Sequence, residues 1–144
     1  MTCDGSVRNN QGSYGFVIID EEHESIIQGF GKVHKTYNEH TSQRAEFYGT
    51  AAFVIVYKIL IQRFNLSPVQ RNKVYIDNEG VVEDLSEDER KPGLKVHLAP
   101  DTEMSVLIKS ILQQVKATIE WIWIKGHQDR NTIMQIINVL HRRY

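Results

Sequence analysis

Three acidic residues and one histidine stand where a folded chain could bring them together. Asp4 follows a short β-type run at the start of the sequence, and Asp77 follows the apolar run Val74–Ile76. Glu46 lies in the first turns of an expected long helix, and His127 comes just beyond a strand-like segment. Carboxylate oxygens are the ligands that Mg²⁺ prefers, and an imidazole with a pKa near neutrality can transfer protons. These residues predict a divalent-metal site for phosphodiester hydrolysis.

Metal-assisted hydrolysis explains why several carboxylates would be needed. Two ions about 4 Å apart activate a water on one side of the phosphorus and stabilise the leaving oxygen on the other. Each residue alone has a simpler explanation, because aspartates after strands form turns and glutamates early in helices offset the helix dipole. A lone histidine in a loop is usually a surface residue. The prediction therefore rests on the whole set in its order along the chain.

Length and composition indicate a single globular domain over residues 1–144. The chain is 41% hydrophobic and 24% charged, without low-complexity tracts or internal repeats. No apolar run is long enough to cross a bilayer and no signal peptide is visible, so we expect an intracellular protein, cytoplasmic or nuclear, with no membrane partner. The single Cys3 fits a reducing compartment. We expect a monomer.

The charge is unevenly distributed along the chain. The net charge is −1, whereas nucleic-acid phosphates call for a basic surface. Basic residues gather locally in Lys32–Lys35 and again from Lys125 to Arg143, and Glu83–Glu89 is an acidic run. A nucleic acid would therefore contact local basic segments, with the acidic run facing away.

Hydrophobic periodicity predicts alternating strands and helices. The expected strands are Met1–Asp4, Tyr14–Asp20, Ser25–Val33, Lys73–Ile76 and Thr118–Ile124. The expected helices are Thr41–Phe64, Glu79–Leu85, one that Asp101 or Thr102 caps, and a last one that carries Ile133, Ile136, Ile137 and Leu140. Residues Glu87–Ala99, with a proline and a glycine, are expected to form a loop. The alternation of Trp121 and Trp123 with isoleucines places both rings on one face, in the core.

The order of these elements implies an α/β protein with a mixed sheet and helices packed on its faces. Ligands of open α/β sheets collect beyond the carboxyl ends of the parallel strands. Asp4 and Asp77 are expected at two such ends, with Glu46 reaching the same place from the long helix.

Four motifs in chain order resemble those of the type 1 ribonuclease H family. They are Asp4–Ser6 followed by Gly12 and Gly15, then Thr41–Glu46, then Tyr75–Asn78, and finally Trp121–Asp129. Together they extend over nearly the whole chain. Segments Thr41–Gly49 and Lys125–Asp129 look most like the members from retroelements, in which the domain is associated with a reverse transcriptase.

The resemblance implies a ribonuclease H-like fold with a mixed five-stranded sheet and helices on both faces. It also implies endonucleolytic hydrolysis of the RNA strand of RNA–DNA hybrids with Mg²⁺, for which Mn²⁺ can substitute. Asp4, Glu46 and Asp77 would be catalytic metal ligands, and His127 would be a mobile imidazole near the leaving group.

The same resemblance implies the nucleic-acid contacts. Thr41, Ser42 and Gln43 correspond to positions that contact the minor groove or the DNA phosphate, and Asn78 and Lys125 are assigned to the same surface. Such a surface would recognise a hybrid through its 2′-hydroxyls and backbone shape. We also expect the chain to be part of a larger reverse transcriptase polyprotein.

The sequence departs from the family at both ends. The family has a fourth carboxylate, an aspartate in the last helix, whereas no Asp or Glu follows Asp129 here. Asn131, Asn138 or Arg142 would occupy that region. Only three residues precede Asp4, although strands usually contain about five or six, so we interpret the domain as clipped at both ends.

These departures leave three interpretations of function. The first is a ribonuclease H impaired by the loss of the fourth carboxylate. The alternative is a catalytically silent nucleic-acid-binding or structural remnant of a retroelement polyprotein. Another phosphoryl-transfer enzyme on the same fold, such as an integrase, is disfavoured by the loop Lys125–His127.

Overall fold

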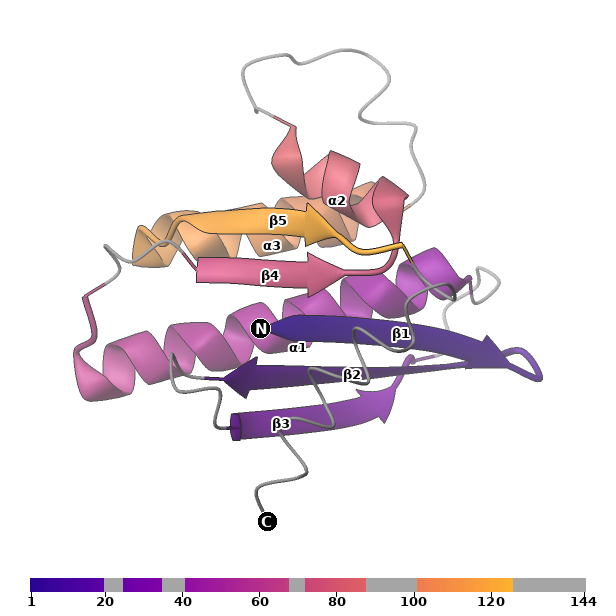
Figure 1. Cartoon of the computed structure of the whole chain (residues 1–144), viewed down its shortest axis with the longest axis horizontal. Helices are drawn as coiled ribbons and strands as arrows, with labels where there is room; N and C mark the ends of the chain where they lie inside the picture. Colours follow the sequence, from indigo (N-terminus) through magenta and orange to yellow (C-terminus); the bar gives the residue numbers. More distant parts are fainter. Residues whose placement is uncertain (20–24, 35–40, 68–71, 88–100, 126–144) are drawn as a thin grey trace.

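Five strands form one mixed sheet (Figure 1), in a computed structural model that describes residues 1–19, 25–34, 41–67, 72–87 and 101–125. The strands are β1 (Thr2–Arg8), β2 (Gln11–Ile19), β3 (Ser25–Lys32), β4 (Asn72–Ile76) and β5 (Ile119–Trp123). Their spatial order is β3-β2-β1-β4-β5. The first three are antiparallel neighbours, whereas β4 runs parallel to both β1 and β5. The mixed five-stranded sheet predicted from the sequence is confirmed.

Strand β1 is longer than the sequence pattern suggested. It has seven residues and pairs with β2 as far as Arg8 and Gln11, so Asp4 lies inside the strand and not at its end. The turn between the two strands consists of Asn9 and Asn10, which have φ of 51° and 57°. Asparagine tolerates this left-handed conformation, which two-residue hairpin turns require. The expected strand end at Asp4 was therefore wrong, because the Asn-Asn hairpin signal was not recognised.

Three described helices pack against the sheet: α1 (Ser42–Phe64), α2 (Glu79–Ser86) and α3 (Thr102–Val115). Figure 1 shows α1 and α3 side by side behind the strands. The Thr41 hydroxyl accepts a hydrogen bond from the Arg44 N–H at 3.0 Å, so Thr41 is the N-cap of α1. The last predicted helix, with Ile133 and Leu140, lies outside the described residues.

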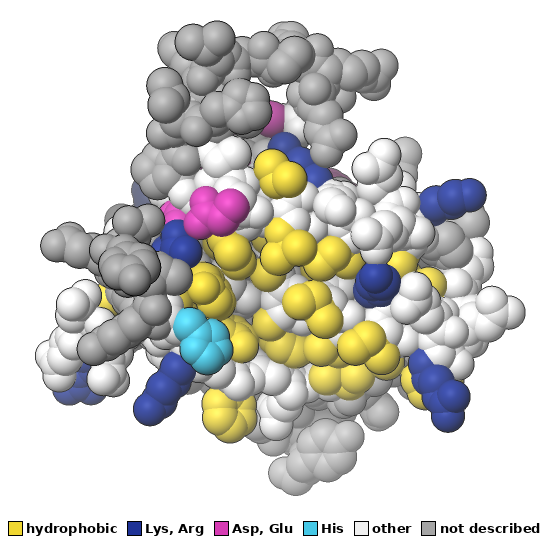
Figure 2. Space-filling model, turned by 180° about the vertical axis from the view of Figure 1, so that it is seen from behind, with side chains coloured by type: hydrophobic (Ala, Val, Ile, Leu, Met, Phe, Trp, Pro, Cys, Tyr) yellow, Lys and Arg dark blue, Asp and Glu magenta, His cyan; other side chains and the backbone are white. Residues whose placement is uncertain are grey.

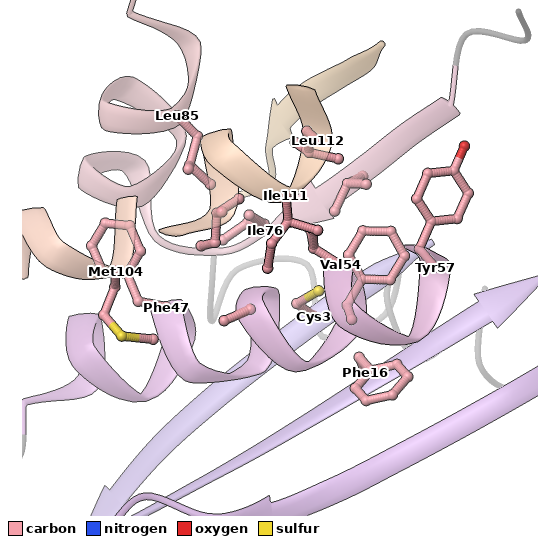
Figure 3. Packing of buried hydrophobic residues seen from close by; sticks show 14 of the residues in the cluster. Cys3, Phe16, Phe47, Val54, Tyr57, Ile76, Leu85, Met104, Ile111 and Leu112 are labelled. Carbon is pink, nitrogen blue, oxygen red and sulfur yellow. The ribbon is translucent and has the colours of Figure 1, made fainter. Parts of the chain in front are cut away.

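A single hydrophobic core joins the three helices to one face of the sheet (Figure 3). Its fully buried members from α1 include Phe47, Phe53 and Val54. They meet side chains from the sheet and from α2 and α3, among them Cys3, Phe16, Val74, Ile76, Val81, Leu85, Ile108 and Ile111. This packing holds the start of α1 against β1.

Helix α1 is long and apolar enough to cross a membrane by length and composition alone. Of its most apolar window, 56% is buried inside the protein, and the helix carries the buried charged residues Arg44 and Glu46. Both properties are typical of the core helix of a domain.

One local prediction is confirmed and another is wrong in part. Asp101, one of the two expected caps, is the N-cap residue of α3, in a left-handed conformation with φ 63°, although its side chain makes no capping hydrogen bond. It binds Arg44 instead, since a buried guanidinium needs a carboxylate partner. Trp121 packs against the core as expected, whereas Trp123, in the last position of β5, is 43% exposed.

Candidate metal centre and nucleic-acid surface

The register of the two central parallel strands brings two aspartates together. Cys3 of β1 pairs with Ile76 of β4. Because the two strands are parallel, the residues that follow this pair, Asp4 and Asp77, lie beside each other. Glu46, in the second turn of α1, reaches the same place from the helix layer. One carboxylate oxygen from each of these residues lies within 4.8 Å of the other two.

Gly5 allows α1 to approach β1 this closely. Its N–H donates a hydrogen bond of 2.6 Å to Glu46 Oε1. A Cβ atom at position 5 would lie 2.3 Å from the backbone nitrogen of Glu46 and 2.4 Å from the carbonyl carbon of Ala45, too close for any side chain. The glycine therefore holds Glu46 beside the two aspartates. The sequence offered a signal for this role in the Asp-Gly pair, but the partner in the helix was not predictable.

Burial and neighbouring charge control the protonation of Glu46. The residue is only 2% exposed, and this burial, followed by the hydrogen bond and charge of Asp77, raises its pKa to about 10. The Gly5 N–H opposes the rise, and Asp4 adds to it. Glu46 Oε2 is buried without a hydrogen-bond donor among the described residues. At neutral pH the carboxyl group of Glu46 therefore carries a proton.

This donor set fits a hard divalent cation. It consists of carboxylate oxygens, which Mg²⁺ and Mn²⁺ prefer, and one of them is buried and lacks a partner. A cation would supply the positive charge that lets Glu46 ionise. Cys3 is also close, but burial raises the pKa of its thiol to about 12, so it is not a thiolate ligand.

An ion-pair cluster that the sequence did not predict anchors the start of α1 to α3. The Arg44 guanidinium contacts the carboxylates of Asp101 and, at 3.0 Å, Glu103. It also lies over the ring of Tyr48, 5.8 Å from its centroid. Arg44 and Asp101 are buried, whereas Glu103 is largely exposed. Nothing in the spacing of these residues marked them as partners, because their pairing depends on the packing of α1 beside α3.

The residues assigned to hybrid binding lie around the starts of α1 and α2. Ser42 is exposed and Gln43 is half-buried. A Cβ atom on Gly80 would lie 3.5 Å from Gln43 Oε1 and 3.4 Å from Asn78 Oδ1, so these side chains are neighbours. Asn78 Oδ1 accepts a hydrogen bond from the Val81 N–H and caps α2. Both Thr41 and Asn78 therefore have a structural role as caps, which leaves the Asn78 amide nitrogen for other contacts.

Lys125 lies beyond the end of β5, at the same edge of the sheet as Asp77. The Ile124 N–H donates to the carbonyl of Ile76 at 2.9 Å, which continues the pairing of the two strands to this point. The lysine side chain is exposed. His127, and the region around Asn138 where a fourth carboxylate was sought, lie outside the described residues.

Comparison of the sequence with models of protein families finds no match, and comparison with curated proteins finds none. The structure does match solved ribonucleases H. LC11-RNase H1, isolated from compost by a metagenomic approach and solved in complex with an RNA/DNA hybrid, is 18% identical with a TM-score of 0.66, over 90% of this chain and 87% of that chain. The N-terminal RNase H domain of a Mycobacterium tuberculosis protein is 19% identical with a TM-score of 0.63, over 98% and 94%.

A viral protein shares the fold within a much longer chain. The foamy viral protease-reverse transcriptase, also solved in complex with an RNA/DNA hybrid, is 14% identical with a TM-score of 0.56, over 92% of this chain but 18% of that chain. At these identities the likeness shows the fold. The chain has a ribonuclease H-like fold, as the sequence motifs predicted.

Proposed function

We propose that this chain is a metal-dependent ribonuclease that cleaves the RNA strand of RNA–DNA hybrids endonucleolytically. The observation that carries the proposal is the convergence of Asp4, Glu46 and Asp77 on a ribonuclease H-like fold. Solved proteins with this fold, LC11-RNase H1 and the foamy viral protein, bind RNA/DNA hybrids. Paired carboxylates of this kind are typical of phosphodiester chemistry.

Asp4, Glu46 and Asp77 would hold Mg²⁺, or Mn²⁺ in its place. When bound, the cation lowers the pKa of a bound water and stabilises negative charge at the phosphate. Glu46 keeps a proton in the metal-free protein, so cation binding would have to displace it. His127 would transfer a proton on the leaving side.

The hybrid would lie across the starts of α1 and α2. Ser42 and Gln43 offer polar side chains there, and Asn78 offers its amide nitrogen. Thr41 adds a hydroxyl that can donate while it caps the helix. Lys125 would neutralise phosphate near the metal centre. These groups suit recognition of backbone shape and 2′-hydroxyls better than recognition of bases.

The missing fourth carboxylate suggests impaired activity. No Asp or Glu follows Asp129, so the second ion would lose part of its charge compensation. Because Mn²⁺ binds oxygen and nitrogen ligands more tightly, it should support cleavage better than Mg²⁺. The loss of the fourth carboxylate also favours the alternative function, a silent nucleic-acid-binding remnant.

We further propose a retroelement origin within a reverse transcriptase polyprotein, for which the foamy viral protein gives an example of the fold inside a long chain.

A cleavage assay separates the enzyme from the remnant. A labelled RNA–DNA hybrid is incubated with the protein in Mg²⁺ or Mn²⁺, beside Asp77→Asn, which keeps the shape of the side chain and removes its charge. We expect slow cleavage in Mg²⁺, faster cleavage in Mn²⁺, and a loss of at least about 100-fold in the variant. Hybrid binding without cleavage in either metal would support the remnant. Cleavage that survives Asp77→Asn would contradict the proposed site.

A further inference from the structure

Helix α1 has a second apolar stripe on the side that faces away from the sheet. The exposed side chains Ile55 and Ile59 are 44% and 56% exposed. With Ala52 and Gln62 they are spaced by three, four and three residues along the helix. This is the spacing of a helix-packing seam, which in a monomer is expected on the buried side alone.

Helix α3 widens this stripe into a surface. Glu103 of α3 contacts Arg44 of α1, and Gln114 of α3 accepts a hydrogen bond of 2.7 Å from Lys58 of α1. Leu107, 43% exposed, lies one turn beyond Glu103 on the same side of α3, between these two contacts. Figure 2 shows this face toward the viewer, with hydrophobic side chains gathered across its centre. We call Ala52, Ile55, Ile59 and Leu107 the outer helical surface.

The charges around the outer helical surface are arranged with opposite signs at opposite ends. Glu103 lies at the level of Arg44, near the start of α1, and its side chain is 60% exposed. Lys58 and Arg63 lie near the other end of α1, and Lys116 ends α3. The exposed charge at the N-terminal end of α3 is thus acidic, whereas those toward the C-terminal ends of both helices are basic.

We propose that the outer helical surface binds a second copy of this chain, with the two α1 helices antiparallel across a two-fold axis. If the two-fold axis passes midway between Ala52 and Ile55, the small Ala52 of each copy packs against the large Ile55 of the other, so the seam is complementary to itself. The same axis places Arg44 of one copy opposite Arg63 of the other along the helices. Glu103 of each copy therefore meets Arg63 of the other, whereas a parallel arrangement would place like charges together.

The size of the surface predicts a weak dimer. The seam from Ala52 to Gln62 is about 15 Å long, and two helices side by side are about 20 Å wide. This footprint of roughly 300 Å² is less than half of the area per partner in a standard protein interface, so we expect dissociation constants of about 100 µM or weaker. The proposal replaces the monomer expected from the sequence and is independent of the proposed nuclease activity.

Sedimentation over a range of concentration tests the proposal. From about 5 µM to about 500 µM, the weight-average mass of the whole chain should rise from that of one copy toward that of two. Ile55→Glu should weaken association by roughly tenfold or more, because it places a charge at the centre of the seam. The matched control is Phe30→Glu, since Phe30 is 91% exposed on β3, outside this surface, and its replacement should leave association unchanged. Circular dichroism checks that each variant is folded.

A charge exchange tests the orientation. Arg63→Glu alone should weaken the dimer, and combining it with Glu103→Lys should restore most of the lost association, because opposite charges meet again. A mass that stays at one copy up to the highest concentration would overturn the proposal. So would unchanged association of Ile55→Glu, or equal loss in Phe30→Glu, which would indicate nonspecific contact. Failure of the exchanged pair to restore the dimer would overturn the antiparallel arrangement.

Discussion

At the residue scale, Glu46 links the fold to the chemistry of the candidate site. It is held by the Gly5 N–H, buried by α1 and faced by two aspartates, and its pKa is raised to about 10. The same contacts that place the carboxylate for a cation therefore make it costly to ionise without one. Such conflict between stability and function is expected at sites that bind charge.

The raised pKa of Glu46 predicts how the stability of the metal-free protein changes with pH. An unfolded chain releases this proton near pH 4.5, whereas the folded chain keeps it until about pH 10. Between these values the folded state binds the extra proton, so the free energy of unfolding falls as pH rises, by at most about 1.4 kcal/mol per unit. Glu46→Gln removes this dependence and should be more stable than the parent by about 1 to 3 kcal/mol at pH 8.

Urea denaturation with a metal chelator, from pH 5 to pH 9, measures this difference. The advantage of Glu46→Gln should grow with pH, and saturating Mn²⁺ should reverse it, because the cation stabilises only the parent strongly. An advantage that does not change with pH would mean that Glu46 is already ionised in the folded protein.

At the element scale, Arg44 joins α1 to α3. Its buried partner Asp101 is the N-cap residue of α3, and its exposed partner Glu103 follows two residues later. Arg44→Met should cost about 3 to 5 kcal/mol of stability, because it leaves Asp101 charged and buried without a partner. Asp101→Asn in the same chain should recover most of this loss, since asparagine also tolerates the left-handed conformation.

Glu103→Gln is the matched control for Arg44. Its side chain is mostly exposed, so its loss should cost less than about 1 kcal/mol. Thermal and urea unfolding of the parent chain and the three variants measure these differences. If Arg44→Met lowered the free energy of unfolding equally with and without Asp101→Asn, the unpaired carboxylate of Asp101 would not be the cause of the loss.

The sequence predicted the helices and strands well where residues close together in the chain determine them. The positions of α1 and α3 in the chain could be identified from neighbouring residues alone. The length of β1 and the pairing of Arg44 with Asp101 could not, because they depend on a turn conformation and on helices that are distant in sequence. The outer helical surface was hidden for a related reason: both stripes of α1 are apolar, and periodicity does not say which one faces the core.

At the scale of the whole molecule, the convergence of the carboxylates depends on strand order. β1 and β4 are neighbours although α1 lies between them in sequence, and this crossover brings Asp4 beside Asp77. The motifs predicted that proximity through resemblance to a known fold. The buried state of Glu46 and the role of Gly5 needed the packed structure, because they arise from contact between layers.

Charge at the whole-molecule scale predicts how a hybrid would bind. With a net charge of −1, the chain has few cations to spare for phosphate, and Lys125 stands at the sheet edge nearest Asp77. Binding should therefore be modest and should weaken steeply with salt, since each phosphate contact releases counterions.

Lys125→Ala should weaken binding to all hybrid sequences alike and reduce the slope of log K against log salt by about 0.7 to 0.9. Fluorescence anisotropy with two unrelated hybrids, from about 20 mM to 200 mM salt, measures both effects. Lys73→Ala is the control, because Lys73 lies near the start of β4, toward the opposite end of the strand from Asp77. A slope that Lys125→Ala leaves unchanged would place the hybrid away from this edge of the sheet.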